Sequence, residues 1–124
     1  MLGGQEHLEE LRNYKEPENT GEYIEMDEIN RSMYYAAIGA YGENLEYKPE
    51  NDVLWLAQKA VESKAQLPEM LMTCGTEDFL YEINLRYSAE FEKLGVKHKL
   101  ETWSGVHNWL FWEESIKKYI DFFT

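Results

Sequence analysis

The second half of the chain alternates between strand and helix patterns, and this alternation restricts its possible folds more than any other feature. Residues 70–74 form a short apolar run closed by Gly75, as in a parallel strand covered on both faces. The next apolar residues recur every three or four positions, and Gly95 follows where such a helix would end. These residues are Leu80, Ile83, Tyr87, Phe91 and Leu94.

A second strand and a final helix complete the pattern. Between residues 96 and 102, His98 and Leu100 alternate with lysines, which predicts a half-exposed strand whose edge the charges protect. After the loop 104–107 comes a helix with a predicted core stripe of Trp112, Ile116, Tyr119, Ile120 and Phe123. The order strand, helix, strand, helix predicts the α/β class, with two parallel strands, a crossover helix and flanking helices.

The first half of the chain carries weaker helical patterns. A short helix is predicted over residues 5–14, and Asp27 could cap a helix that runs to about residue 38. Asn51 or Asp52 could cap another, and Pro68 lies beyond its end. Since 124 residues leave room for one core, we expect a single partial domain over residues 1–124.

Charge and composition exclude several classes of protein. The chain has 24 acidic and 12 basic residues, so its net charge of −12 does not suit nucleic acid. No apolar stretch approaches the ~20 residues of a membrane span. No targeting segment is visible, which favours the cytoplasm, while secretion of a longer parent protein stays open. Three histidines and the single Cys74 lack the spacing of a metal site, so neither a metal nor a cofactor is expected.

A polar residue that could take part in catalysis follows each predicted strand. The first strand leads into Gly75-Thr76-Glu77-Asp78, and the second leads into Ser104-Gly105-Val106-His107. Chemistry in open α/β sheets gathers outside the carboxyl ends of the strands, so Asp78 and His107 are expected to meet. The carboxylate would accept from Nδ1–H and leave Nε2 as a general base, as in a hydrolytic triad.

Several short motifs resemble the C-terminal portion of esterase D-like α/β-hydrolases, which include tributyrin-type, feruloyl and acetylxylan esterases and S-formylglutathione hydrolases. The resemblance covers residues 40–124, whereas residues 1–39 match weakly. It rests on Tyr-Gly-Glu at 41–43, Glu-Asn-Asp-Val-Leu at 50–54, Leu-Pro at 67–68, Cys-Gly-Thr-Glu-Asp-Phe-Leu-Tyr-Glu at 74–82, Asn-Leu-Arg at 84–86 and Gly-Val-His-Asn-Trp at 105–109.

The resemblance implies a serine carboxylic ester hydrolase, with Asp78 as the catalytic acid and His107 as the catalytic base. Trp109 and Trp112 would support the histidine loop and are weak candidates for contact with substrate. Asn108 departs from the family, in which an acidic residue often follows the histidine. The substrate would be a small ester, and aryl, sugar acetyl and thioester-derived substrates stay open.

No serine of the chain stands in the Gly-x-Ser-x-Gly motif of a nucleophile elbow. Ser104 on the histidine loop, Ser32 within a predicted helix and Cys74 at a strand end are poor substitutes. We therefore expect the chain to be an esterase fragment that is inactive alone. The alternative is a non-catalytic module whose unpaired strand edge drives self-association into a homo-oligomer.

Structural interpretations stand beside these functional ones. Asp78 could cap the following helix, and His107 taken alone would more often be structural. His98 on a strand and His7 in an acidic stretch are interpreted as structural or solvated. The four tryptophans could line an aromatic cleft, but packing explains them equally well.

Overall fold

The two strands form a parallel pair in the computed structural model, which describes residues 4–18 and 20–124. Strand β1 (Leu71–Gly75) pairs with β2 (Lys99–Trp103) along the full length of both. The register places Gly75 opposite Trp103, so both strands end at the same edge of the sheet. The second strand begins later than its sequence pattern suggested, and Val96 is buried ahead of it.

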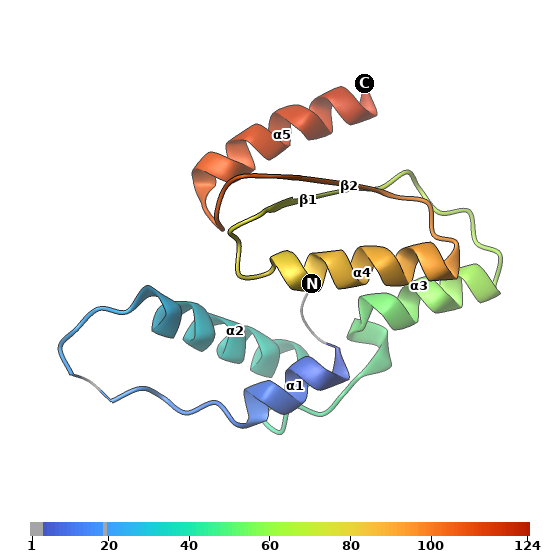
Figure 1. Ribbon diagram of the computed structural model, residues 1–124. Coiled ribbons are helices and arrows are strands. Elements are labelled where there is room, and N and C mark those ends of the chain that lie inside the picture. The colour runs from blue at the N-terminus through green and yellow to red at the C-terminus, as the bar shows by residue number, and fades with distance from the viewer. Residues whose placement is uncertain (1–3, 19) are drawn as a thin grey trace. The chain divides into compact units, whose positions relative to one another are not determined.

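Helix α4 (Tyr81–Leu94) connects the two strands and packs on one face of the sheet (Figure 1). Tyr87 and Phe91 of the predicted helical stripe are buried there. Gly95 ends the helix in the left-handed conformation, with φ of 76°, as its position in the sequence indicated. The predicted crossover helix is therefore confirmed.

Helix α5 (Trp109–Phe123) covers the other face, so the sheet lies between two helices (Figure 1). The predicted core stripe of this helix is wrong in part, because its buried residues are Phe111 and Ser115. Ile116, Ile120 and Phe123 of that stripe are 54%, 58% and 61% exposed.

The cause lies in the width of the sheet. Two strands are ~5 Å apart, whereas a helix with its side chains is ~10 Å across, so a two-stranded sheet covers only a narrow strip of α5. That strip faces β1, where the Thr73 hydroxyl donates to Ser115 Oγ (3.2 Å) and shares a 2.8 Å hydrogen bond with the Tyr119 hydroxyl.

The earlier residues have their own small core. Helix α1 (Gln5–Arg12) and helix α2 (Glu25–Tyr41) precede a 3-10 turn, η1 (Pro49–Asn51). Asp27 does not cap α2, which begins two residues earlier; it lies in the acidic first turn, where the helix dipole favours negative charge. The core of this part consists of Leu8, Leu11, Tyr41 and Leu45.

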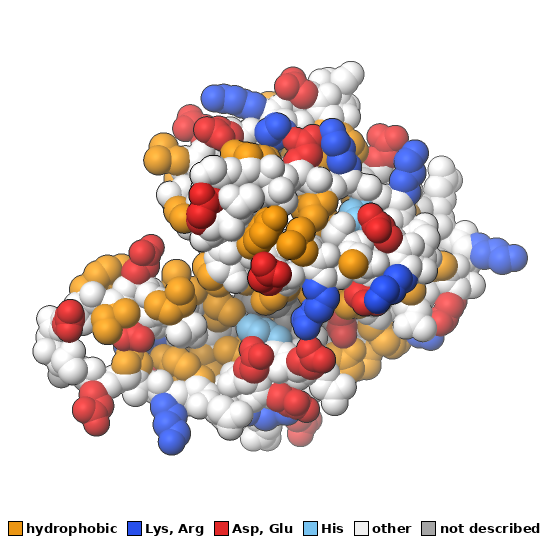
Figure 2. Space-filling model, viewed as in Figure 1, with side chains coloured by type: hydrophobic (Ala, Val, Ile, Leu, Met, Phe, Trp, Pro, Cys, Tyr) orange, Lys and Arg blue, Asp and Glu red, His pale blue; other side chains and the backbone are white. Residues whose placement is uncertain are grey.

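Helix α3 (Val53–Glu62) follows η1, and the Asp52 carboxylate caps it by accepting from Leu54 N–H at 3.0 Å. The contacts within the chain divide the described residues into two units, one up to Leu56 and one over Ala57–Thr124. Apolar and charged side chains mingle at the surface (Figure 2). None of the helices in the described part of the chain has the length and hydropathy that crossing a bilayer requires.

Candidate active site

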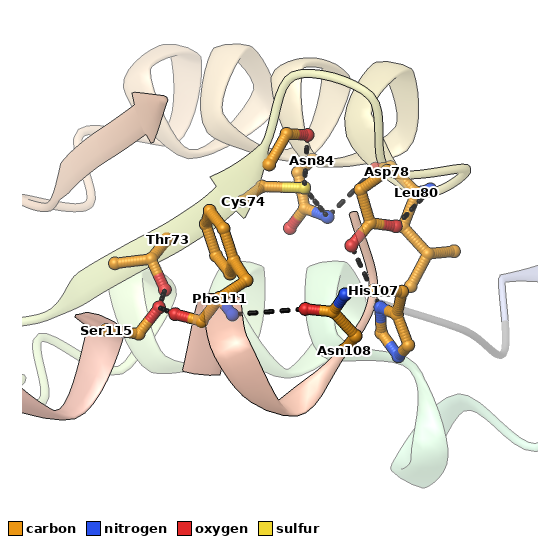
Figure 3. A network of polar contacts seen from close by, with 10 residues as sticks. Thr73, Cys74, Asp78, Leu80, Asn84, His107, Asn108, Phe111 and Ser115 are labelled. Atoms are coloured by element: carbon orange, nitrogen blue, oxygen red, sulfur yellow. Dashed lines mark hydrogen bonds and ion pairs between the residues drawn. The ribbon is translucent and has the colours of Figure 1, made fainter. Parts of the chain in front are cut away.

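Asp78 lies in the turn between β1 and α4 and is buried, with its side chain 5% exposed. One carboxylate oxygen, Oδ1, accepts from Leu80 N–H at 2.8 Å, which holds the turn that leads into α4. The other oxygen, Oδ2, lies 2.9 Å from Nδ1 of His107 (Figure 3). Asp78 thus supports the start of the helix and contacts the histidine at the same time.

His107 lies between β2 and α5, and its side chain is 40% exposed. A carboxylate can only accept, so the hydrogen bond to Asp78 places the shared proton on Nδ1. In the neutral ring, Nε2 is then the acceptor, and Figure 3 shows the far side of the imidazole turned away from Asp78. The structure therefore brings the two predicted residues together in a geometry suited to a general base.

Aromatic rings flank the imidazole of His107. The Phe79 ring centroid lies 5.1 Å from it, and Trp112 approaches edge-on at 5.0 Å. Trp109 packs edge-on against Trp112 and is otherwise 81% exposed. Trp103 stacks instead on Phe111, so its ring serves packing. Trp112 thus contacts the histidine, and Trp109 contacts Trp112 from the exposed side.

Asn108, which follows the histidine, caps α5. Its Oδ1 accepts from Phe111 N–H at 3.1 Å (Figure 3). Asparagine and aspartate are about equally good at this position, so the departure from the family pattern keeps the local structure.

Sequence reasoning missed Glu77, which joins the two loops that carry Asp78 and His107. Its carboxylate accepts from Ser104 Oγ at 2.6 Å, from Gly105 N–H at 3.0 Å and from the Thr76 hydroxyl. These hydrogen bonds, with that from Ser104 the strongest influence, lower the pKa of Glu77 to about 2. We call Glu77 with Thr76, Ser104 and Gly105 the loop clasp. In the sequence, the only sign of this role of Glu77 is its place directly before Asp78, the candidate catalytic acid.

The candidate nucleophiles differ in their exposure and contacts. Ser104 donates to Glu77, and Ser32 lies on the exposed side of α2. Cys74 is 3% exposed, and burial, followed by the charge of Asp78, raises the pKa of its thiol. Within residues 4–18 and 20–124, no serine or cysteine side chain makes a hydrogen bond to His107.

A second serine–histidine contact occurs away from this site. Nε2 of His98 lies 2.6 Å from Ser88 Oγ, and Nδ1 lies 2.9 Å from the Val96 carbonyl oxygen. Because a carbonyl oxygen only accepts, Nδ1 carries the proton and Nε2 accepts from the hydroxyl. Ser88 is buried within α4, so this pair satisfies polar groups inside the fold. Across the described residues, no three His, Cys, Asp or Glu side chains gather where they could hold a metal ion.

Comparison with known proteins identifies the fold. No family profile matches the chain, and no curated protein matches it in sequence. Among solved structures, it is similar to the fluorophosphonate-binding serine hydrolase FphF of Staphylococcus aureus, with a TM-score of 0.57 and 34% identity. That match covers 59% of this chain and 29% of the other.

A second similar structure is the S-formylglutathione hydrolase FrmB of S. aureus, with a TM-score of 0.54 and 25% identity. The match covers 82% of this chain and 33% of that hydrolase. The chain thus spans a third or less of the hydrolases it matches. It has part of an α/β-hydrolase fold, and these structural neighbours are serine hydrolases.

Proposed function

We propose that the chain is the acid and base portion of a serine carboxylic ester hydrolase of the esterase D-like kind. The observation that carries this proposal is the 2.9 Å hydrogen bond between buried Asp78 and half-exposed His107 at the carboxyl edge of the strands. The similarity to two serine hydrolases supports it. The sequence has no Gly-x-Ser-x-Gly motif. We therefore assign the nucleophile to another segment of such a hydrolase, one that these 124 residues do not include.

In this proposal, Nε2 of His107 takes the proton of the serine hydroxyl as its oxygen attacks the ester carbonyl. The carboxylate of Asp78 holds the ring orientation and stabilises the imidazolium that forms. His107 then gives the proton to the departing alcohol, which leaves an acyl-serine. In the second round, the same nitrogen takes a proton from a water molecule as that water attacks the acyl carbonyl, and His107 then returns the proton to the serine oxygen as the acid leaves.

The chain alone provides the first test, with a short-chain aryl acetate as substrate. We expect no turnover above the background, because a triad without its nucleophile retains little catalysis. If turnover does occur and is abolished by both His107→Ala and a fluorophosphonate, the site is complete within an assembly of these chains.

A chimaera provides the stronger test. Residues 57–124 would replace only the part of the S. aureus S-formylglutathione hydrolase that aligns with them, and that hydrolase would supply the rest of the chain. We expect ester hydrolysis that Asp78→Ala and His107→Ala each reduce by at least about 10³-fold. Ser63→Ala, an exposed serine on the same graft, is the matched control and should retain full activity.

Circular dichroism would show that each chimaera is folded. A folded chimaera whose activity survives His107→Ala would refute the proposed role of the histidine.

Exposed apolar side chains on α5 favour a second candidate, a self-associating module without catalysis. Trp109, Leu110 and Phe123 are 81%, 74% and 61% exposed, and Ile116 and Ile120 lie along the same helix. Apolar surface of this kind on a soluble protein marks a contact site.

The outer edge of β1 adds to this argument. Lys99 N–H donates to the Met70 oxygen, and Thr76 N–H donates to the Trp103 oxygen. Because hydrogen bonds alternate along a strand, the main-chain groups of Leu71 and Thr73 point away from β2. Light scattering tests this candidate: a strictly monomeric, folded chain would count against it.

A further inference from the structure

The loops that carry Asp78 and His107 are joined at three successive levels. The last bond of the strand ladder runs from Thr76 N–H to the Trp103 oxygen, at 2.9 Å. The loop clasp comes next, and beyond it lies the hydrogen bond between Asp78 and His107. Glu77 directly precedes Asp78, and Gly105 stands two residues before His107.

The clasp binds Gly105 from both sides. The Glu77 carboxylate accepts from Gly105 N–H, and the Glu77 N–H donates to the Gly105 oxygen at 3.2 Å. The side chain of Ser104 adds a third bond, at 2.6 Å. Two adjacent residues of the histidine loop are therefore tied to one residue of the acid loop.

The main chain of the histidine loop has little apolar packing. The exception is Gly105, which lies close to the Phe111 ring. Ser104 and His107 are exposed, and Val106 is 46% exposed. The main chain of an exposed loop depends strongly on its hydrogen bonds. The polar clasp thus restrains the loop that carries the imidazole, whereas the Phe79 and Trp112 rings restrain the imidazole itself.

A carboxylate suits this position best. The three groups that meet it, the Ser104 and Thr76 hydroxyls and Gly105 N–H, all donate to it. A glutamine could still bond these groups, because a hydroxyl also accepts, but hydrogen bonds to a charged oxygen are about twice as strong as neutral ones. Glu77→Gln therefore weakens the clasp by about the strength of one ordinary hydrogen bond while it keeps the size of the side chain.

We propose that Glu77 is a positioning residue, which sets the hydrogen bond between Asp78 and His107 by clasping the histidine loop. It acts through His107 rather than on a substrate. Its functional meaning rests on the proposed esterase site, but its structural effect is measured independently of hydrolysis.

The test follows the His107 ring proton on Nδ1 by nitrogen-15 NMR in the full chain at neutral pH. In the wild type, this proton is hydrogen-bonded to Asp78, so we expect it to exchange slowly with water. In Glu77→Gln, exchange should be about tenfold faster, the change expected when a hydrogen bond of ordinary net strength is lost. Ser104→Ala removes one clasp bond and should give a smaller increase.

Glu92→Gln is the matched control, because it removes one negative charge from an exposed site on α4. It should leave the exchange rate unchanged, and so should any variant that lowers the overall stability without touching the clasp. Circular dichroism verifies that each variant is folded.

An unchanged exchange rate in folded Glu77→Gln would overturn the inference, whether or not the chimaera hydrolyses esters. Conversely, an inactive chimaera together with faster exchange in Glu77→Gln would refute the proposed function alone.

Discussion

The close approach of Gly75 and Gly105 gives the sharpest prediction about this site. A Cβ added to Gly75 would lie 2.1 Å from the Gly105 oxygen and 2.6 Å from its carbonyl carbon. Carbon and oxygen atoms in contact stay about 3.3 Å apart, so Gly75→Ala must push the two loops apart by roughly 1 Å. The obstacle is main chain, which cannot turn aside as a flexible side chain would.

This displacement would carry Nδ1 of His107 and Oδ2 of Asp78 from 2.9 Å to about 4 Å, beyond hydrogen-bond range. Overpacking of this kind costs about 1–3 kcal/mol. For a chain of this length, the midpoint of thermal unfolding should fall by about 4–12 °C. Circular dichroism measures the midpoint, and ring-proton exchange at His107 reports the hydrogen bond.

Gly39→Ala is the matched control, since a Cβ there meets no atom within 4 Å. It should stabilise α2 by about 0.5–1 kcal/mol and leave the His107 signal unchanged. If Gly75→Ala melts like the wild type and keeps the protected ring proton, the loops do not touch as described, and the reasoning is refuted.

Three further predictions concern Glu77, Cys74 and Phe111. Because the pKa of Glu77 is lowered to about 2, its stabilising contribution should be complete above the ordinary glutamate pKa and lost as the pH falls from about 4.5 to 2. Glu77→Gln should remove that part of the acid-unfolding curve, and an identical curve would contradict the clasp. Cys74, buried and with a raised pKa, should react with Ellman's reagent on the order of 100-fold more slowly in the folded chain than in urea. Equal rates would show that the thiol is accessible. Phe111→Ala removes a buried ring stacked on Trp103 and should cost about 3–5 kcal/mol in urea unfolding, whereas a loss below about 1 kcal/mol would contradict its burial.

Local patterns in the sequence were sufficient for the order of the elements in the second half. The apolar run before Gly75 and the three- and four-residue spacing before Gly95 predicted β1 and α4, because both depend on neighbours within a few residues. The same reasoning placed Asp78 and His107 at the ends of two adjacent parallel strands. Their contact at 2.9 Å follows from that topology.

Only the tertiary structure decided which face of α5 is buried. Periodicity identifies an apolar face, but the width of the sheet determines how much of it is covered, and two strands leave Ile116 and Ile120 exposed. Likewise, no local pattern marks Glu77, because its partners Ser104 and Gly105 lie 27 and 28 positions away. Those groups meet only because the register sets Gly75 opposite Trp103, so the chemistry of the site depends on a pairing that no short stretch of sequence contains.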